Sequence, residues 1–143
     1  MKIGFAGDHA GYLLASPIQK VLESRGIDFV NFGTFGPESV DYSDFAHPLA
    51  TAVEKGEVNL GIAACGTGNG MAMTLNKHRG IRAGLAWNTE IAKLVKGHNN
   101  ANVLVLPQRF ISEEQALECV KVWLDTQFEG GRHERRISKI PVD

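Results

Sequence analysis

Apolar residues in this chain of 143 residues gather in five short runs, and longer amphipathic segments separate these runs. Apolar runs without polar alternation are typical of parallel strands that are covered on both faces. We expect such strands at residues 2–7, 27–32, 58–64, 81–87 and 103–106. The run at 58–64 is apolar throughout its second half, which predicts a central strand.

The segments between these runs place apolar residues three or four positions apart, which is the spacing of one helix face. Helices are expected from about residue 13 to a stop at Gly26, over 42–55, from near 68 to a turn at 76, over 89–96, and from 112 to about 127. Thr89 is the predicted N-cap of the fourth helix, with Gly97 as its stop. Ser112 and Gln115 have the spacing of a capping box for the fifth.

Strands that alternate with helices predict an α/β fold, a Rossmann-like doubly wound sheet of five parallel strands with helices on both faces. No repeat or low-complexity segment divides the chain, so residues 1–143 are expected to form one domain. A polar stretch at 129–143 would form a basic C-terminal arm. Pro17 and Pro48 interrupt two of the helical patterns, and the sequence leaves open whether they lie inside helices.

Polar clusters fall at the carboxyl ends of the predicted strands. They are Asp8-His9, Asp41-Tyr42, and Cys65 with the glycines that follow it. Ligands of doubly wound sheets bind outside the carboxyl ends of the strands. The sequence therefore predicts one functional site along this edge of the sheet.

The loop at residues 66–70 reads GTGNG and connects a predicted strand to a predicted helix. Such a turn points backbone N–H groups toward an anion, although its spacing is not that of a dinucleotide fingerprint and no Walker lysine follows. Alone, a tight turn that needs positive φ is about as good an interpretation as a ligand cradle. Cys65 and Thr67 favour function, because an amide nest is expected to lower the pKa of a thiol toward neutrality, and such a thiol can take a proton from carbon. A buried strand-end cysteine is the alternative.

Two further clusters have both a structural and a functional interpretation. His98 and Asn99 follow a helix stop, so His98 is either a C-terminal cap or a functional imidazole. Arg132 and Arg136 lie four residues apart, so on a helical turn they would face one way and clamp a phosphate, with Arg109 as a third guanidinium. A solvated, partly disordered arm is the alternative for the basic stretch.

Composition and charge exclude several classes of protein. A hydrophobic content of 43% is ordinary for a globular protein, and a net charge of −1 gives no field that would recruit nucleic acid or an anionic membrane. Cys65 and Cys119 form no CxxC pair, which predicts free thiols and a cytoplasmic location. The five histidines lack metal-ligand spacing, so we expect no metal.

Six sequence blocks together resemble the type B ribose-5-phosphate isomerases. They run in family order over nearly the whole chain: DHAG (8–11), SVDYSDFA (39–46), CGTGNGM (65–71), NKHRGIRA (76–83), HNNANVL (98–104) and FEGGRHERRI (128–137). The resemblance implies interconversion of ribose 5-phosphate and ribulose 5-phosphate through an enediolate, without metal or organic cofactor. It also implies an active site shared across the interface of a homodimer or a dimer of dimers.

The same resemblance assigns roles to individual residues. Cys65 would be the base that moves a proton between C1 and C2, Thr67 would help to move a hydroxyl proton, and His98 would open the furanose ring. The substrate-binding residues would be the loop residues Gly66, Gly68, Asn69 and Gly70, the sugar contacts Asp8, His9, Asp41, Tyr42 and Asn99, and the phosphate ligands Arg109, Arg132 and Arg136.

Other functions remain open from sequence. Isomerases of allose 6-phosphate or galactose 6-phosphate share the fold, so a six-carbon substrate is the nearest alternative. A non-catalytic phosphosugar-binding module would use the same loop as a passive anion cradle. A cysteine-dependent hydrolase would use Cys65 as nucleophile, although the longer phosphate loop that ends in arginine is missing from this sequence. The anomer bound, the physiological direction and the choice between dimer and tetramer also stay open.

Overall fold

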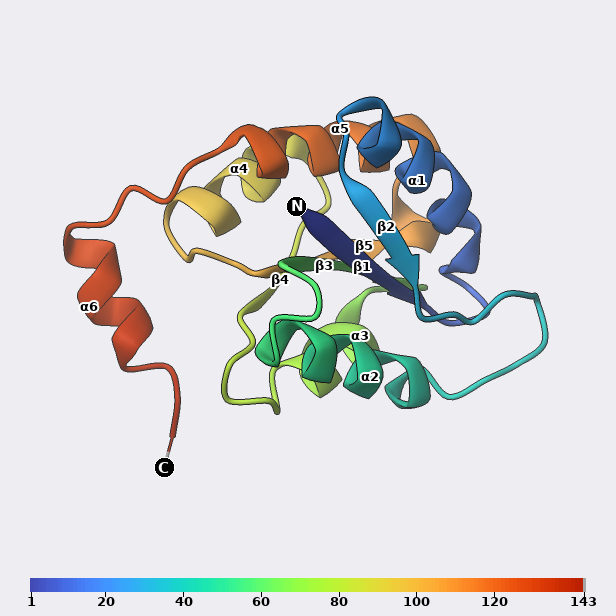
Figure 1. Ribbon diagram of the computed structural model, residues 1–143, viewed down its shortest axis with the longest axis horizontal. Coiled ribbons are helices and arrows are strands. Elements are labelled where there is room, and N and C mark those ends of the chain that lie inside the picture. Colours follow the sequence, from blue (N-terminus) through green and yellow to red (C-terminus); the bar gives the residue numbers. More distant parts are fainter. Residues whose placement is uncertain (143) are drawn as a thin grey trace.

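The computed structural model describes residues 1–142, and Asp143, the last residue of the predicted arm, lies outside them. Its strands are β1 (Lys2–Gly7), β2 (Asp28–Asn31), β3 (Leu60–Cys65), β4 (Ala83–Leu85) and β5 (Val103–Pro107) (Figure 1). Its α-helices are α1 (Ala15–Ser24), α2 (Ser43–Glu54), α3 (Asn69–Leu75), α4 (Thr89–Gly97), α5 (Glu113–Asp125) and α6 (Arg132–Ser138). Short 3-10 helices, η1 (Tyr12–Leu14) and η2 (Gln108–Phe110), follow β1 and β5. No helix in residues 1–142 combines the length and the apolar character that a bilayer span requires.

The strands form one parallel sheet in the order β2-β1-β3-β5-β4. In the register, Gly7 of β1 lies opposite Ala64 of β3, and Cys65 of β3 lies opposite Pro107 of β5. The segments that follow these strands therefore meet at one side of the sheet, which we call the carboxyl edge. We call the opposite side, where the strands begin, the amino edge. The predicted doubly wound sheet of parallel strands is confirmed.

Helices cover both faces of the sheet (Figure 1): α1, α4 and α5 lie on one face, and α2 and α3 lie on the other. Successive side chains of β3 point to opposite faces, so fully buried Ile62 packs in the core under α1 and α5, and fully buried Ala63 packs in the core under α2 and α3. Burial on both sides explains why this strand has no polar alternation.

The helix ends match the predicted caps in part. The N-cap of α4 is Asn88, whose Oδ1 accepts a hydrogen bond from the backbone N–H of Ile91 at 2.8 Å, so the prediction of Thr89 was wrong by one residue. At α5, the Oγ of Ser112 accepts from the N–H of Gln115 at 3.1 Å, as a capping residue does.

Both uncertain prolines lie inside helices. Pro17 is in the first turn of α1, where its missing N–H would have no intrahelical partner in any case. Pro48 lies in the interior of α2 and is exposed, so the helix tolerates the loss of one backbone hydrogen bond on its outer side. Gly97 is the last residue of α4 rather than a residue beyond it, and His98 is the C-cap.

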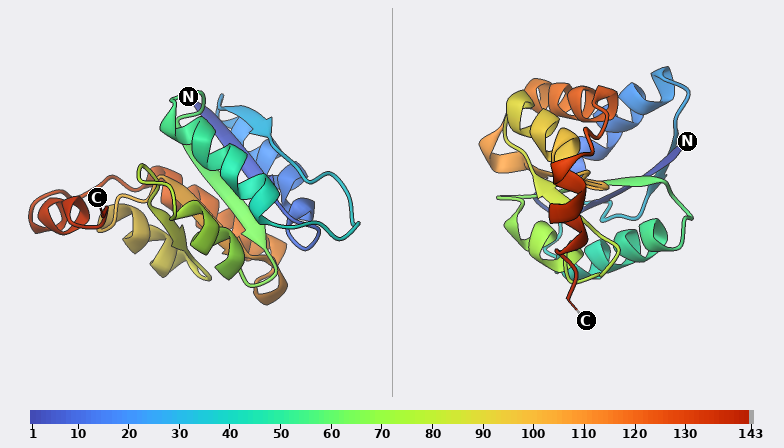
Figure 2. Two further views of the ribbon diagram at one scale, coloured as in Figure 1. Left: turned by 90° about the horizontal axis from the view of Figure 1, so that it is seen from below. Right: turned by 90° about the vertical axis from the view of Figure 1, so that its left-hand side faces the viewer.

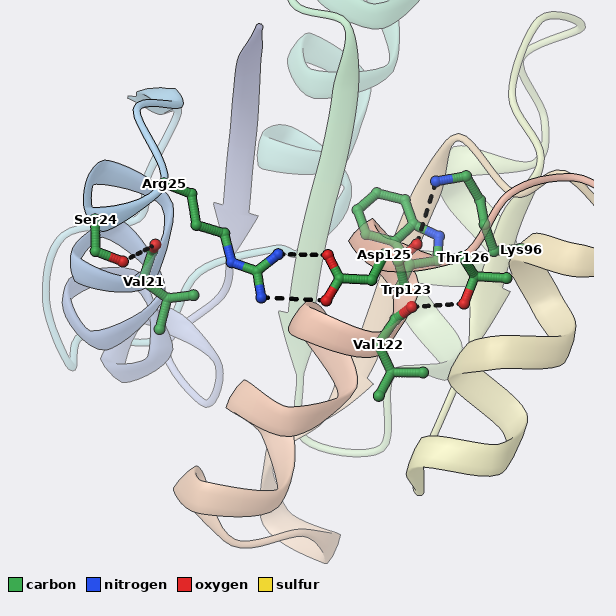
Figure 3. Close-up of polar contacts among 8 residues, drawn as sticks. All are labelled: Val21, Ser24, Arg25, Lys96, Val122, Trp123, Asp125 and Thr126. Atoms are coloured by element: carbon green, nitrogen blue, oxygen red, sulfur yellow. Dashed lines mark hydrogen bonds and ion pairs between the residues drawn. The ribbon is translucent and has the colours of Figure 1, made fainter.

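Polar contacts fix the C-terminal end of α5 to two neighbouring helices (Figure 3). The guanidinium of Arg25, which follows α1, forms a bidentate salt bridge with Asp125: its two terminal nitrogens donate to the two carboxylate oxygens at 2.6 and 3.3 Å. The Nζ of Lys96 in α4 donates to the carbonyl of Trp123 at 3.3 Å and lies 4.7 Å from the centre of its ring. The chain therefore leaves the body of the protein from a fixed point.

Beyond that point, the predicted basic arm contains α6, which lies apart from the sheet and from the helices that cover it (Figures 1 and 2). Gly130 and Gly131 precede α6 with φ angles of 70° and 58°, a left-handed backbone conformation that glycine adopts readily. The arm is helical over Arg132–Ser138, so a partly disordered segment is not what the structure shows there.

Candidate active site

The loop after β3 turns its backbone amides toward the Cys65 sulfur. Gly68 begins the turn into α3 with φ of 80°, a conformation that favours glycine. A Cβ at this position would also collide with Leu85, so both the backbone and the packing require glycine here. The backbone N–H groups of Met71, Gly68 and Gly70 act on the thiol and favour its charged form. The predicted strand, glycine loop and helix are thus present, with the cysteine facing the amides.

Burial nevertheless dominates the electrostatics of this cysteine. Cys65 is only 4% exposed, and burial raises the pKa of its thiol, to which the negative charge of nearby Asp8 adds. The amides of Met71, Gly68 and Gly70 lower the pKa by less than this. The expectation that the loop brings the pKa of Cys65 down toward neutrality was therefore wrong, because desolvation of the thiolate outweighs the amide nest.

Asp8 and His9 follow β1 at the same carboxyl edge. The N–H of Asp8 donates to the carbonyl of Ala64 at 3.3 Å, and its own Oδ1 accepts from the N–H of Ala10 at 2.9 Å. The Nδ1 of His9 accepts from the N–H of Val40 at 3.2 Å, which ties the loop before α2 to the loop after β1. The structure therefore places Asp8 close to Cys65 and His9 at the same edge, in contact with the loop before α2.

Tyr42 and Arg109 border the glycine loop. A Cβ at Gly70 would lie 2.6 Å from the Cζ atom of Tyr42, so the tyrosine ring packs directly on this glycine, with Asp41 the residue before it. The N–H of Arg109 donates to the carbonyl of Gly66 at 3.0 Å, and its side chain lies over the same glycine. Arg109 belongs to the glycine loop and not to the arginines of α6.

A second cluster lies at the amino edge, where α4 ends. The imidazole rings of His98 and His133 are stacked, with centroids 4.3 Å apart and planes 13° from parallel. The Oε2 atom of Glu129 lies 3.2 Å from Nε2 of His98, and its Oε1 atom lies 3.7 Å from Nε2 of His133. The backbone N–H of Glu129 donates to the carbonyl of Gly97 at 2.9 Å, which attaches the start of the arm to the end of α4.

This cluster borders a pocket of about 320 Å³ that suits an anion. Burial lowers the pKa of His133, and the positive charges of His98 and Arg132, followed by that of Arg136, lower it further against the opposing effect of Glu129. The pocket is lined by His98, Asn99, His133, Arg136, Ile137 and Ile140. Of the two predicted phosphate ligands of α6, Arg136 therefore lines the same pocket as His98 and Asn99, whereas Arg132 does not line it and is near enough for its charge to act on His133.

Within one chain, the two clusters are separated by the length of the sheet. Cys65 ends β3 beside Pro107, whereas His98 and Asn99 precede Val103, the first residue of β5. Five residues of strand at about 3.3 Å each put roughly 16 Å between the two edges. A five-carbon sugar phosphate is shorter than that. One chain therefore does not bring all the predicted site residues to a single substrate.

Three residues near the two clusters were not predicted to belong to a site. The Gln108 side chain donates to the carbonyls of Ala10 and Gly11 at 2.7 and 2.9 Å in the amide orientation that satisfies all three groups. Glu129 and His133 complete the amino-edge cluster. Both lie in the block FEGGRHERRI, so the signal was present, but spacing along the chain does not show that the arm folds back onto His98.

The two clusters suit different chemistry. A thiol that faces backbone amides can exchange a proton with carbon while those amides hold negative charge on a neighbouring oxygen. Paired arginines and imidazoles suit a phosphate. Together they fit a reaction that moves protons at one end of a molecule and holds a phosphate at the other.

The chain belongs to the Ribose/Galactose Isomerase family, whose model matches residues 3–140. Within this family, the resemblance to type B ribose-5-phosphate isomerases is confirmed. Ribose-5-phosphate isomerase B of Escherichia coli is 41% identical over 97% of this chain and 93% of that protein.

Solved structures agree with this assignment. The crystal structure of a ribose 5-phosphate isomerase from Thermotoga maritima superposes with a TM-score of 0.94 at 46% identity, covering 98% of this chain and 97% of that one. The enzyme from Mycoplasma genitalium, whose structure contains bound ribulose-5-phosphate, gives a TM-score of 0.93 at 40% identity over 97% and 93% of the two chains.

Proposed function

We propose that the protein interconverts ribose 5-phosphate and ribulose 5-phosphate by moving a proton between C1 and C2. The observation that carries the proposal is the position of Cys65, at the end of β3 and facing the amides of the glycine loop. The relatives named ribose-5-phosphate isomerase B support the choice of substrate, and so does the ribulose-5-phosphate bound to one of them.

In the proposed mechanism, the Cys65 thiolate takes the C2 proton of the open-chain aldose. The electrons of the broken C–H bond form the C1–C2 double bond, and the carbonyl oxygen becomes the enediolate oxygen. The amides of the loop, including those of Gly66, Gly68, Asn69 and Gly70, hold that charge. Thr67 passes the O2 proton to O1, and Cys65 returns its proton to C1 to give the ketose. Loss of one donor to such an oxyanion typically costs about 10²–10³ in rate.

The amino-edge cluster enters this mechanism from a second copy of the chain. Because the sheet holds the two clusters apart within one chain, we infer a homodimer in which the carboxyl edge of one copy faces the amino-edge pocket of the other. The partner subunit's His98 would then give a proton to the furanose ring oxygen, while Asn99 of the partner subunit would bind a sugar hydroxyl. Arg132 of the partner subunit and Arg136 of the partner subunit would bind the phosphate.

The remaining predicted residues keep sugar-binding roles at the carboxyl edge. Asp8 and His9 would contact hydroxyl groups, with Asp41 and Tyr42 nearby, and Arg109 would reach the phosphate from beside Gly66. The chemistry uses only side chains and backbone amides, so we propose neither a metal nor an organic cofactor. A cytoplasmic location accords with two free thiols.

One assay separates this function from its alternatives. The wild-type protein should convert ribose 5-phosphate to ribulose 5-phosphate and, in deuterated water, should incorporate deuterium at C2 of the aldose. Faster turnover of allose 6-phosphate or galactose 6-phosphate would assign a six-carbon substrate. Binding without deuterium incorporation would identify a passive phosphosugar module, and release of inorganic phosphate would identify a hydrolase.

Mixing two inactive variants tests the shared site. Cys65→Ala and His98→Ala should each be inactive alone. After denaturation and refolding together, the mixture should recover about a quarter of the wild-type activity, because half of random dimers are mixed and each has one intact site of two. No recovery, with mixed dimers present by mass spectrometry, would contradict the proposed arrangement.

A further inference from the structure

Glu129 brings one carboxylate into contact with two imidazoles. Its side chain is 58% exposed, yet Oε2 lies 3.2 Å from Nε2 of His98 and Oε1 lies 3.7 Å from Nε2 of His133. The two rings stack against each other at 4.3 Å, so the carboxylate lies against the same edge of both rings. His133 is buried, so the half-buried His98 and the exposed Glu129 both contact a ring that is fixed in place.

The backbone around Glu129 is held as well as its side chain. Its N–H donates to the carbonyl of Gly97 at 2.9 Å, at the last residue of α4. A Cβ at Gly97 would lie only 3.1 Å from the Oε2 atom of Glu129, so the carboxylate rests directly on the helix end where His98 follows. Absence of a side chain at Gly97 leaves the space that this contact needs.

We propose that Glu129 is a positioning residue for His98, whose carboxylate fixes the imidazole ring so that Nδ1 is the nitrogen left to face the sugar. This inference rests on the proposed isomerase function and on the assignment of His98 to ring opening. It adds Glu129 to the residues of the ring-opening step. The arm, which carries Glu129, then contributes to ring opening as well as to phosphate binding. A fixed donor avoids the entropy of aligning the ring during reaction.

The step that Glu129 would support is opening of the furanose. The bond between C1 and the ring oxygen breaks, and that oxygen takes a proton from Nδ1 of the protonated imidazole. The C1 hydroxyl gives its proton to water, and its oxygen becomes the aldehyde carbonyl. The imidazole remains in contact with Glu129 through Nε2 and regains its proton from solvent before the next turnover.

The same three side chains could instead be considered as metal ligands, because their ligand atoms lie within 4.8 Å of one another. The stacking opposes this interpretation. An imidazole lone pair lies in the plane of its ring, and one ion does not lie in two nearly parallel planes 4.3 Å apart at the centroids. Arg132 and Arg136 add positive charge beside the cluster, which favours an anion over a cation.

Ribulose 5-phosphate offers a direct test, because its C5 oxygen is esterified and the sugar has no furanose form. Exchange of its C1 proton with deuterated water therefore needs the Cys65 step but no ring opening. We expect Glu129→Gln to lower kcat for ribose 5-phosphate by about 10- to 100-fold, the range found when the carboxylate that orients a metal-binding histidine is removed. Deuterium exchange into ribulose 5-phosphate should fall by less than about threefold, because it relies on the other cluster.

Two further variants sharpen the test. Glu134→Gln removes the same charge from the same arm, where the structure gives this carboxylate no imidazole contact within residues 1–142, and it should change both rates by less than about twofold. Gly97→Ala keeps the carboxylate but pushes on its Oε2 atom, so it should lower ring opening by a smaller factor in the same direction as Glu129→Gln.

Each outcome has one meaning. Equal loss of ribose 5-phosphate conversion and of ribulose 5-phosphate exchange in Glu129→Gln, or no loss beyond that of Glu134→Gln, overturns the positioning role. A lower KM for ribose 5-phosphate with kcat kept would show instead that the carboxylate competes with phosphate, and would also overturn it. Failure of the wild-type protein to exchange or convert either sugar would contradict the isomerase function itself.

Discussion

The two clusters at opposite edges of the sheet present different chemical groups: backbone amides around a buried thiol at one, and charged and imidazole side chains at the other. At the carboxyl edge, Cys65 is 4% exposed and faces backbone amides that the turn at Gly68 holds in place. At the amino edge, His98 is half-buried and Glu129 is exposed, and both are held by the stacked ring of His133 and by an arm whose helix α6 lies away from the sheet (Figure 2). The first cluster is a product of the fold, and the second depends on a short exposed helix.

This difference suits the two tasks. A proton transfer at carbon needs donors that do not move as charge develops, and backbone amides in a tight turn meet that need. Binding a phosphate tolerates side chains that settle on the substrate, because much of the contribution is attraction between opposite charges. Substitutions at the carboxyl edge should therefore affect proton transfer and folding, whereas those on the arm should affect substrate binding and ring opening and leave the fold intact.

The largest effect is expected at Cys65. Cys65→Ala removes the proposed base and should lower kcat by about 10²- to 10⁴-fold, the usual contribution of general base catalysis. Cys119→Ala is the matched control: this thiol is also buried, but it belongs to α5 and packs in the core on that face of the sheet. Its kcat should stay within about twofold of wild type, at a cost near 1 kcal/mol in stability. Near-normal turnover of Cys65→Ala would show that another group is the base.

The next largest effect is expected on the free energy of unfolding, which should fall more after a Gly→Ala substitution at the carboxyl edge than after one on the arm. Gly68→Ala places a Cβ in a left-handed residue and against Leu85, so the free energy of unfolding should fall by about 2 to 4 kcal/mol. Gly130→Ala also places a Cβ at a positive φ, here 70°, just before α6 but with open space around it, and should cost at most about 1 to 2 kcal/mol. Urea denaturation measures both. Equal losses would mean that the arm is as firmly built as the loop.

The sequence contained most of the fold. Apolar runs located all five strands, and β1 was predicted to the residue because the turn at residues 8–11 breaks the apolar run directly after Gly7. Strand β4 was predicted at residues 81–87 but covers only Ala83–Leu85, since it is an edge strand paired on one side only. Helix caps were predicted less precisely. Asn88 and Thr89 are adjacent polar residues, and either side chain could accept a hydrogen bond from the first turn of α4, so the pattern did not show that Asn88 is the cap.

The site was predicted less completely than the fold. Residues that follow strands were recognisable, since topology brings strand ends together, and Asp8, His9 and Cys65 do lie at one edge. Two features needed coordinates. The separation of His98 from Cys65 follows from the direction of α4, and the raised pKa of Cys65 follows from burial, which sequence pattern does not measure.

A third prediction concerns the arm. Arg136 lines the amino-edge pocket, so Arg136→Gln should raise the KM for ribose 5-phosphate by about 10- to 100-fold, the value of one or two charge-assisted hydrogen bonds, with little change in kcat. Arg135→Gln removes an equal charge from an exposed neighbour that does not line the pocket, and its KM should rise less than about threefold. If the two variants raise KM equally, the arm attracts substrate by net charge and does not clamp it.

The smallest effect expected is on pH dependence, and it distinguishes the buried thiol from an ordinary one. Because burial raises the pKa of Cys65 above its usual value of about 8.5, the thiolate fraction at neutral pH is low, and kcat/KM should rise with pH by up to about tenfold per unit into the alkaline range. Alkylation by iodoacetamide should follow the same curve. The Cys119→Ala background isolates Cys65, since burial also raises the pKa of Cys119.

As pH rises, the free energy of unfolding should fall while activity increases. A thiol whose pKa is higher in the folded than in the unfolded protein adds stability that is complete below the unfolded pKa and is lost as pH rises through the folded pKa. In Cys119→Ala, the free energy of unfolding should therefore decline over the same alkaline interval in which activity rises, and Cys65→Ala combined with Cys119→Ala should lack that component of the decline. An alkylation rate that has already levelled off at neutral pH would show that the amides of the loop outweigh burial after all. The carboxyl edge would then supply a base that is charged before substrate binds.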